Sequence, residues 1–262
     1  MDYRVSLVGL LIGFLVGLTG MGGGALLTPI MILFFKVPPV FAVGVDFVYS
    51  TIMKGVGTMI HIRHKQVNFK IAWYLSRGSI PGVLLSSILI HVFLKSHGNL
   101  INNLISHSIG VVLLLAAFFL LCKPFLLRRV KTLSTAKGLI PVFLTFRPLI
   151  VSCLGFLIGF IIGMTSIGSG SLILVCLTLI YPRLSAKELV GTDIFQALLL
   201  LFAGSVVYIA ASSINWHLVF LLLIGALPGV IIGSLVTKRI PDAFLRPMLA
   251  LLLIITGIKL LL

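Results

Sequence analysis

Hydrophobic residues fill ten stretches of the chain, and short polar or glycine-rich segments separate them. These stretches are residues 5–19, 24–36, 41–60, 70–93, 104–127, 148–163, 168–181, 186–211, 215–236 and 243–262. A helix needs about 20 apolar residues to cross a hydrocarbon core of about 30 Å, and most of the stretches reach that length. We therefore predict an all-α polytopic membrane protein.

The first two stretches, and the two that open the second half, are each too short to cross comfortably. Residues 5–19 and 24–36 would form helices of roughly 22 and 20 Å at 1.5 Å per residue. Glycine-rich segments separate the short stretches: residues 17–24 (GLTGMGGG, the first hinge) and residues 163–170 (GMTSIGSG, the second hinge). Clustered glycines interrupt a helix and leave peptide N–H groups uncovered. We predict that each hinge is a break between two half-helices inside the membrane.

The half-helix after each hinge would direct its N-terminus toward the membrane interior. Unpaired N–H groups and a partial positive charge at that N-terminus favour an anion. The candidate substrate-binding residues at these two N-termini are Gly22, Gly23, Gly24, Gly168, Ser169, Gly170 and Ser171.

The two halves of the chain match each other residue by residue. Val43-Gly44-Val45-Asp46 corresponds to Val190-Gly191-Thr192-Asp193, and residues 78–82 (GSIPG) correspond to residues 225–229 (GALPG). The offset is 146 before the second stretch and 147 after it, which indicates an internal duplication. We predict two transmembrane repeats of about five hydrophobic segments, residues 1–127 and 148–262, joined by a basic linker at 128–147.

The distribution of basic residues indicates how the repeats are oriented. If each hinge makes a re-entrant hairpin, or if both of its arms cross fully, fourteen lysines and arginines lie on one side of the membrane. Only Arg4, Lys36, Lys95 and Lys259 then lie on the other. Because basic residues concentrate on the cytoplasmic side, we predict inverted repeats, a cytoplasmic linker and both termini outside.

Composition excludes several classes of protein. The 262 residues are 60% hydrophobic and 10% charged, with a mean hydropathy of +1.26, which is incompatible with a soluble globular chain. The net charge of +15 lies mostly between apolar stretches, so we expect contact with lipid headgroups and no nucleic acid. Three cysteines, Cys122, Cys153 and Cys176, lack metal-ligand spacing, and we expect no cofactor or bound metal.

Two of the five acids, Asp46 and Asp193, occupy equivalent positions near the starts of two apolar stretches. Acids within apolar stretches usually face a cavity or a partner, so both are candidates for proton coupling. The alternative is that each caps a helix N-terminus. Further candidate substrate-binding residues in or beside these stretches are Ser50, Lys54, Thr192, Gln196 and Arg77.

Several of these polar residues have two interpretations. Lys54 and Arg77 align with Leu201 and Ile224, so either would meet an anion directly or would extend to the cytoplasmic headgroups. His61 and His64 have a spacing that suits a metal, and His91, His97 and His107 lie near the outer side. No acid or cysteine completes a ligand set, so we interpret the histidines as interfacial.

Certain motifs and their duplication resemble a known family. They are the first hinge followed by Pro29, Ala42-Val43-Gly44, Lys65-Gln66-Val67-Asn68 and residues 78–82. Over nearly the whole chain they are similar to the TauE/SafE family, also called sulfite exporters. The resemblance implies a secondary transporter of small sulfur-containing anions, such as sulfite and sulfonates, in the cytoplasmic membrane of a prokaryote. Where the family usually has Gly-Thr-Ser, this chain has Gly44-Val45-Asp46 and Gly191-Thr192-Asp193.

Our hypothesis is a transporter with an anion site between the two hinges and the two aspartates, working by alternating access. An anion beside a carboxylate favours protonation of that carboxylate, so we expect coupling to protons. A cation permease that uses the aspartates and histidines as ligands is the alternative. We do not expect an enzyme, because the sequence shows no catalytic set of residues at suitable spacing. The sequence leaves open whether the protein is a monomer or a homodimer.

Overall fold

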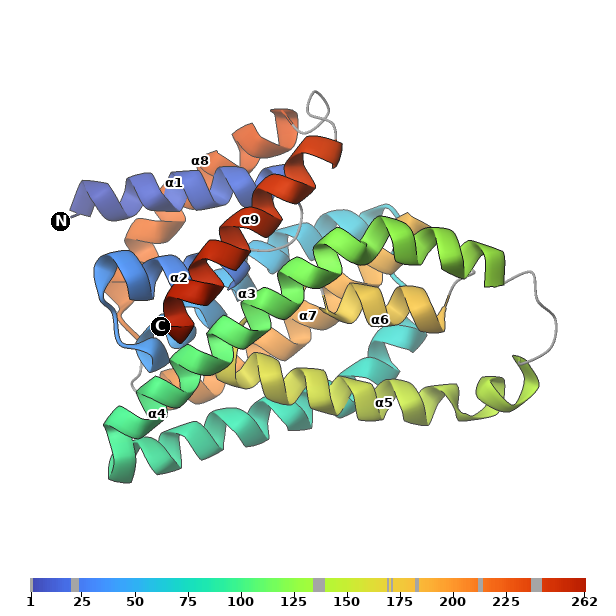
Figure 1. Cartoon of the computed structure of the whole chain (residues 1–262), viewed down its shortest axis with the longest axis horizontal. Coiled ribbons are helices and arrows are strands. Elements are labelled where there is room, and N and C mark those ends of the chain that lie inside the picture. Colours follow the sequence, from blue (N-terminus) through green and yellow to red (C-terminus); the bar gives the residue numbers. More distant parts are fainter. Residues whose placement is uncertain are drawn as a thin grey trace.

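The computed structural model describes residues 2–19, 24–133, 140–168, 170, 172–181, 184–211, 214–236 and 242–262. Over these residues the chain forms helices and no strands, so the predicted all-α class is confirmed. In chain order the helices are α1 (Asp2–Thr19), α2 (Gly24–Phe35), α3 (Pro39–Arg63), α4 (Phe69–Leu133), α5 (Ile140–Thr165), α6 (Leu172–Ile180), α7 (Ala186–Ala210), α8 (Trp216–Val236) and α9 (Asp242–Leu261) (Figure 1).

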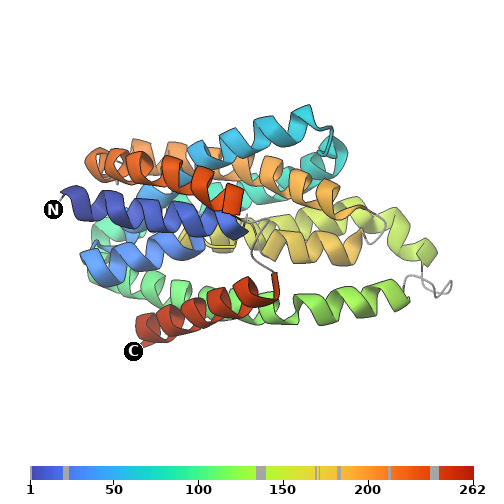
Figure 2. The ribbon, with the colours of Figure 1, turned by 90° about the horizontal axis from the view of Figure 1, so that it is seen from above.

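Each half begins with a helix that enters the molecule and a short helix that turns back. α1 runs inward from the end that carries both chain termini, and α2 returns to that end (Figures 1 and 2). α5 and α6 do the same from the opposite end. With 12 and 9 residues, α2 and α6 are only about 18 and 14 Å long, which is too short to cross a bilayer.

The fourth and fifth predicted stretches belong to one continuous helix. α4 has 65 residues and bends sharply at the end of the molecule near the termini (Figure 1). Its two arms, Phe69–Leu94 and Gly98–Cys122, are each long and apolar enough to cross a membrane. No proline interrupts residues 95–103, so helical hydrogen bonding continues where we had expected a loop. Helix also extends into the predicted linker from both sides, to Leu133 and from Ile140.

The first helix of each half packs against the fourth segment of the other half. A Cβ atom on Gly13 of α1 would overlap the backbone of Ala226 in α8, and a Cβ atom on Gly159 of α5 would overlap the backbone of Ser79 in the first arm of α4. The two contacts are equivalent, because Gly13 and Ala226 correspond to Gly159 and Ser79 under the repeat offsets. Small residues at these positions let the helix backbones approach each other closely.

Two further contacts between the halves join equivalent helices. α3 packs on α7, and the second arm of α4 packs on α9, where Gly110 and Gly257 lie side by side. Equivalent helices also run in opposite directions: α1 leads away from the end with the termini and α5 leads toward it (Figure 1). The N-terminal half of α3 is almost entirely buried at the centre of this arrangement.

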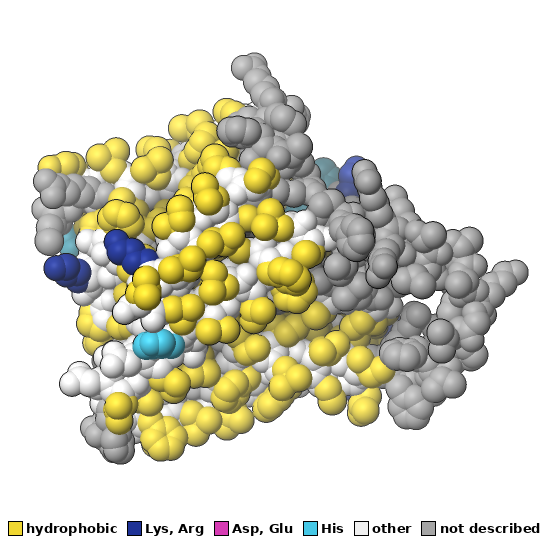
Figure 3. Space-filling view, in the orientation of Figure 1, with side chains coloured by type: hydrophobic (Ala, Val, Ile, Leu, Met, Phe, Trp, Pro, Cys, Tyr) yellow, Lys and Arg dark blue, Asp and Glu magenta, His cyan; other side chains and the backbone are white. Residues whose placement is uncertain are grey.

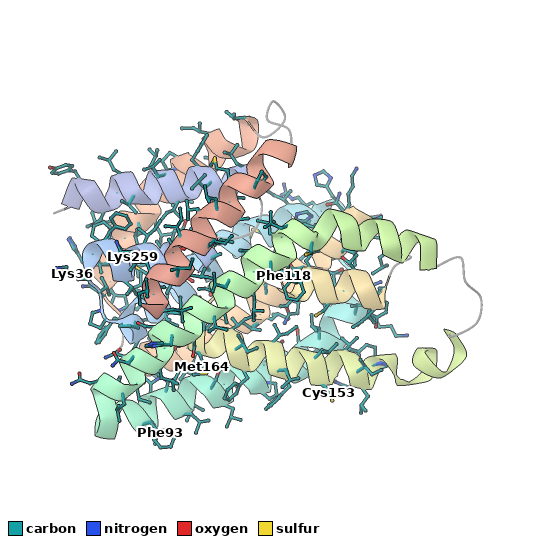
Figure 4. The ribbon with its side chains drawn as sticks, viewed as in Figure 1. Lys36, Phe93, Phe118, Cys153, Met164 and Lys259 are labelled. Carbon is teal, nitrogen blue, oxygen red and sulfur yellow. The ribbon has the colours of Figure 1, made fainter. Side chains whose placement is uncertain are left out.

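The surface is that of a membrane protein. Hydrophobic side chains cover most of the described part of the face in Figure 3, and the lysines and arginines visible there lie toward the two ends. Lys36 and Lys259 lie at the end with the termini (Figure 4). Large hydrophobic side chains are exposed along the helices, including Phe34, Phe202, Phe220 and Leu235. Six helical segments of the described chain are long and apolar enough to cross a bilayer, which makes this a multi-pass membrane protein.

Candidate functional site

Asp46 lies at the centre of a buried polar cluster. Its carboxylate is fully buried on α3 and accepts a hydrogen bond from Ser50 Oγ, one helical turn further along, over 3.0 Å. Ser166 Oγ donates a hydrogen bond to the other carboxylate oxygen. Both oxygens of the acid therefore have a hydroxyl partner, which a buried carboxylate requires.

Ser166 connects this acid to the second hinge. It is the first residue after α5 and has a φ of 59°, a backbone conformation that few residues other than glycine adopt. Its N–H donates to Ile162 O, and the Thr165 hydroxyl accepts from Ile167 N over 3.2 Å. The hinge thus turns sharply away from the helix and places the Ser166 hydroxyl against Asp46.

A second hydroxyl approaches the same carboxyl group from α2. The Thr28 side chain is fully buried and its hydroxyl lies beside the Asp46 carboxyl group. Tyr49 is also buried, and the charge of Asp46 acts on it, but its hydroxyl has no hydrogen-bond partner. Buried polar groups are usually satisfied, so a hydroxyl without a partner beside an acid indicates capacity for a further ligand or water.

Lys54 belongs to the same cluster. It is only 6% exposed and interacts electrostatically with Asp193 and with Asp46. Asp46, Ser50 and Lys54 follow one another at four-residue spacing, so they occupy one face of α3. The interpretation that Lys54 extends to the headgroups is wrong, because its side chain is enclosed among helices.

The interpretation of the two aspartates as helix caps is also wrong. Asp46 is the eighth residue of α3 and Asp193 is the eighth residue of α7, so each lies roughly 10 Å beyond its helix start. Ser185 caps α7 in a capping box with Glu188. Asp193 is 3% exposed, buried inside the protein.

Thr192 and Gln196 bind other helices of the bundle. Gln196 Nε2 donates to Ser79 Oγ of α4 over 2.5 Å, and both residues are fully buried. The Thr192 hydroxyl accepts from the backbone N–H of Asn68, in the loop between α3 and α4, over 2.9 Å. These bonds tie α7 to the first half of the chain on both sides of Asp193.

Other predicted residues lie away from the cluster. Arg77 is exposed on α4, with its guanidinium 5.3 Å from the centre of the Trp73 ring, and the structure does not bring it to Lys54. Gly24 is the first residue of α2, and Gly168 has a φ of 102°. Gly170 lies in a turn before α6. Gly22, Gly23, Ser169 and Ser171 lie outside the described residues.

The histidines differ from one another in their surroundings. His61 Nδ1 lies 2.7 Å from Gln66 Oε1. The His91 ring packs edge-on against Tyr208, which is fully buried, at 4.7 Å between ring centres. Tyr208 in turn donates to Gly163 O at the second hinge over 3.0 Å and stacks on Phe47. Among the described residues, no group of three or more His, Cys, Asp or Glu is arranged to hold a metal ion.

Four residues of this site were not predicted from the sequence: Thr28, Ser166, Ser79 and Tyr208. Ser166 lies within the second hinge, and Thr28 directly precedes the proline that follows the first hinge. A hydroxyl beside a helix break inside an apolar stretch was therefore an available signal. Ser79 and Tyr208 lie on continuous helices, where the sequence alone shows no reason to select them.

Nearly the whole chain is similar in sequence to known membrane proteins. The profile of the family described as "Sulfite exporter TauE/SafE" matches residues 5–260. The "Probable membrane transporter protein YjnA" of Bacillus subtilis (strain 168) is 38% identical over 260 residues, covering 99% of this chain and all of that protein. The "Probable membrane transporter protein YunE" of the same organism is 24% identical, over 97% of this chain and 94% of that protein. No solved structure shows a significant match.

Proposed function

We propose that this chain, which belongs to the sulfite exporter TauE/SafE family, moves small sulfur-containing anions such as sulfite and sulfonates across the cytoplasmic membrane of a prokaryote. Its relatives carry names that describe membrane transporters, and its apolar helices fit a lipid bilayer. That it is a membrane transporter of this type therefore follows from its family. The substrate, the coupling ion and the orientation are our proposals.

The observation that carries the proposal is the hydrogen bond from Ser166 to Asp46. It joins a buried acid on a membrane helix to the hinge that precedes a half-helix. Broken helices that meet ionisable side chains inside the bilayer are a recurrent way to build a transport site. We place the anion between the hinges and α3, with the peptide N–H groups around Gly24, Gly168 and Gly170 as donors.

Asp46 and Asp193 are the proposed coupling groups. An interior-negative potential opposes the inward movement of an anion by about 2.3 kcal/mol per charge per 100 mV, so uptake needs a coupled cation whereas export does not. A proton taken up by either aspartate would supply that charge. Neither aspartate caps a helix, which removes the alternative structural reason for its presence.

Alternating access would come from inverted repeats, residues 1–127 and 148–262, moving relative to each other. The equivalent contacts of α1 with α8 and of α5 with α4 support a two-fold relation between the repeats. Lys36, Lys259 and both termini lie at one end, to which the sequence assigns only four basic residues against fourteen for the other side. This imbalance supports a topology with the termini outside and residues 128–147 in the cytoplasm.

Transport by purified protein in liposomes tests the function. Proteoliposomes that contain a pH-sensitive dye would be given sulfite, methanesulfonate, acetate or Mn²⁺ on the outside. We expect uptake of the two sulfur anions, accompanied by acidification of the lumen, and little uptake of acetate. Uptake of Mn²⁺ alone would overturn the proposal in favour of a cation permease, and equal uptake of acetate would remove the selectivity for sulfur anions.

The anion site has its own test at the second hinge. Gly170→Val places a β-branched side chain over the N–H groups before α6, so affinity for methanesulfonate should fall about tenfold or more. Gly98→Val, at the bend of α4 where a Cβ atom meets nothing within 4 Å, is the matched control. Full affinity in Gly170→Val would place the site elsewhere.

A further inference from the structure

We propose that Lys54 is the cation that binds the transported anion, and that the anion and the two aspartates compete for its single ammonium group. The inference rests on the proposed anion transport and adds its central chemical step. In the structure the ammonium interacts with Asp193 and Asp46. When an anion binds, the ammonium shifts to it, and a carboxylate that loses its counterion takes up a proton.

The buried position of Lys54 indicates that this lysine has a function in transport. A lysine inside a membrane protein is expensive to bury and marks a functional position unless structure alone requires it. Structure does not require it here, because the equivalent position in the second half is Leu201, a hydrophobic side chain that is fully buried. The first half therefore holds a buried positive charge that the architecture does without in the second half.

The balance of charge in the cluster indicates that a proton binds together with the anion. Two carboxylates and one ammonium, all buried, leave one net negative charge in the cluster when both acids are ionised. A bound monovalent anion would raise this to two, and unbalanced charge in a low-dielectric interior is strongly unfavourable. Proton uptake by an aspartate restores the balance. Each anion should therefore enter together with at least one proton.

The groups that face Asp46 from other elements carry no positive charge that could bind the anion. Thr28 from α2 and Ser166 from the second hinge contribute neutral hydroxyls, and Tyr49 on α3 itself contributes a phenol. The Thr28 hydroxyl, fully buried beside Asp46, is instead a neutral donor from which a sulfonate oxygen beside Lys54 would accept a hydrogen bond. Lys54 is the one buried cation of this cluster among the described residues.

If the anion and the aspartates compete for Lys54, replacing the lysine and replacing an aspartate should change anion affinity in opposite directions. Lys54→Met should weaken binding of methanesulfonate at least tenfold, because a charge-assisted bond is lost. Lys54→Arg should retain most of the affinity. Asp193→Asn removes a competitor, so it should tighten binding several-fold at pH 8. It should also flatten the fall in affinity between pH 6 and pH 8 that we expect of wild-type protein. A purely structural ion pair would not tighten binding when its acid is neutralised.

The experiment is calorimetric titration of purified protein in nanodiscs with methanesulfonate, whose charge is constant over this pH range. Lys259→Met is the matched control, because Lys259 lies at the end with the termini near the Phe34 ring. Thermal unfolding of each variant identifies those that misfold, and Lys54→Leu, which copies Leu201, replaces Lys54→Met if the latter does. Unchanged affinity in a folded Lys54 variant, or weaker binding in Asp193→Asn, overturns the competition while leaving anion transport intact. Absence of binding in wild-type protein overturns both.

Discussion

Ser166 donates a hydrogen bond to the carboxylate of Asp46 from 120 positions further along the chain. The bond links the second hinge to a helix of the first half, so movement of the hinge and the state of the acid depend on each other. A protonated Asp46 would hold this hydroxyl less strongly than a carboxylate does. Protonation is therefore a means by which substrate binding could release the hinge.

Loss of this bond should impair transport. In Ser166→Ala we expect methanesulfonate flux to fall about tenfold, corresponding to ~1–3 kcal/mol for a buried group left without its partner. Ser166→Gly also removes the hydroxyl but suits the positive φ at this position. Equal impairment in both variants assigns the effect to the hydrogen bond, whereas normal flux in the glycine variant would assign it to the backbone. Thr178→Ala, which loses only a bond to Leu174 O within α6, is the control.

Replacing both acids should separate transport from proton movement. In Asp46→Asn combined with Asp193→Asn, the luminal acidification that accompanies anion uptake should drop to the passive leak, because no carboxylate remains at these positions to carry the proton. An imposed inward proton gradient should accelerate uptake in wild-type protein and have no effect in the double variant. If the proton gradient has no effect on wild-type flux, the two acids do not couple transport to protons.

Membrane topology can be tested at two turns in which a lysine with a similar backbone conformation follows a helix. Lys36 follows α2 and Lys65 follows α3, and both have a φ close to 50°. Single cysteines at these positions, in a background without Cys122, Cys153 and Cys176, should react oppositely with an impermeant thiol reagent added to intact cells. We expect labelling at position 36 and protection at position 65. The reverse pattern would invert the topology, and labelling of both would contradict it.

Helix packing makes a prediction about stability. Gly13→Ala would press a methyl group into the backbone of Ala226, and Gly159→Ala would do the same to Ser79. We expect each to lower the free energy of unfolding in detergent by ~1–3 kcal/mol, the usual result of overpacking. Gly98→Ala should be neutral or stabilising by up to ~1 kcal/mol, because alanine favours a helix and the site is open. Thermal unfolding monitored by circular dichroism measures the stability of all three variants. Equal stability of the three would show that the helix contacts at Gly13 and Gly159 are loosely packed.

The sequence was sufficient for the helices and for much of their packing, since both depend on regular spacing. Apolar length predicted the membrane segments, and the close contacts of Gly13 and Gly159 lie where glycines recur at four-residue spacing in the sequence. The continuous course of α4 was not predictable from hydropathy, because polar residues within a helix and polar residues in a loop look alike. The lack of any proline at the bend was the relevant signal.

The site was predicted only in part, because its members meet through the three-dimensional fold. Asp46 and Ser50 share a helix face and were predicted together, whereas Ser166 reaches Asp46 from the second hinge and was not predicted. Lys54 had two interpretations in the sequence, and only its enclosure by α7 distinguishes them. Periodicity describes what one helix presents, and it contains no information on which helix lies opposite.

The packing of α1 on α8 has a consequence for the synthesis and membrane insertion of the protein. Ribosomes add about 5–20 residues per second, so α8 is made roughly 10–40 s after α1. Throughout that interval the glycine face of α1 must be covered by lipid or by the insertion machinery. The first helix to enter the membrane is therefore among the last to find its native neighbour, and a truncated chain that ends before α8 leaves it exposed to whatever degrades unassembled membrane segments.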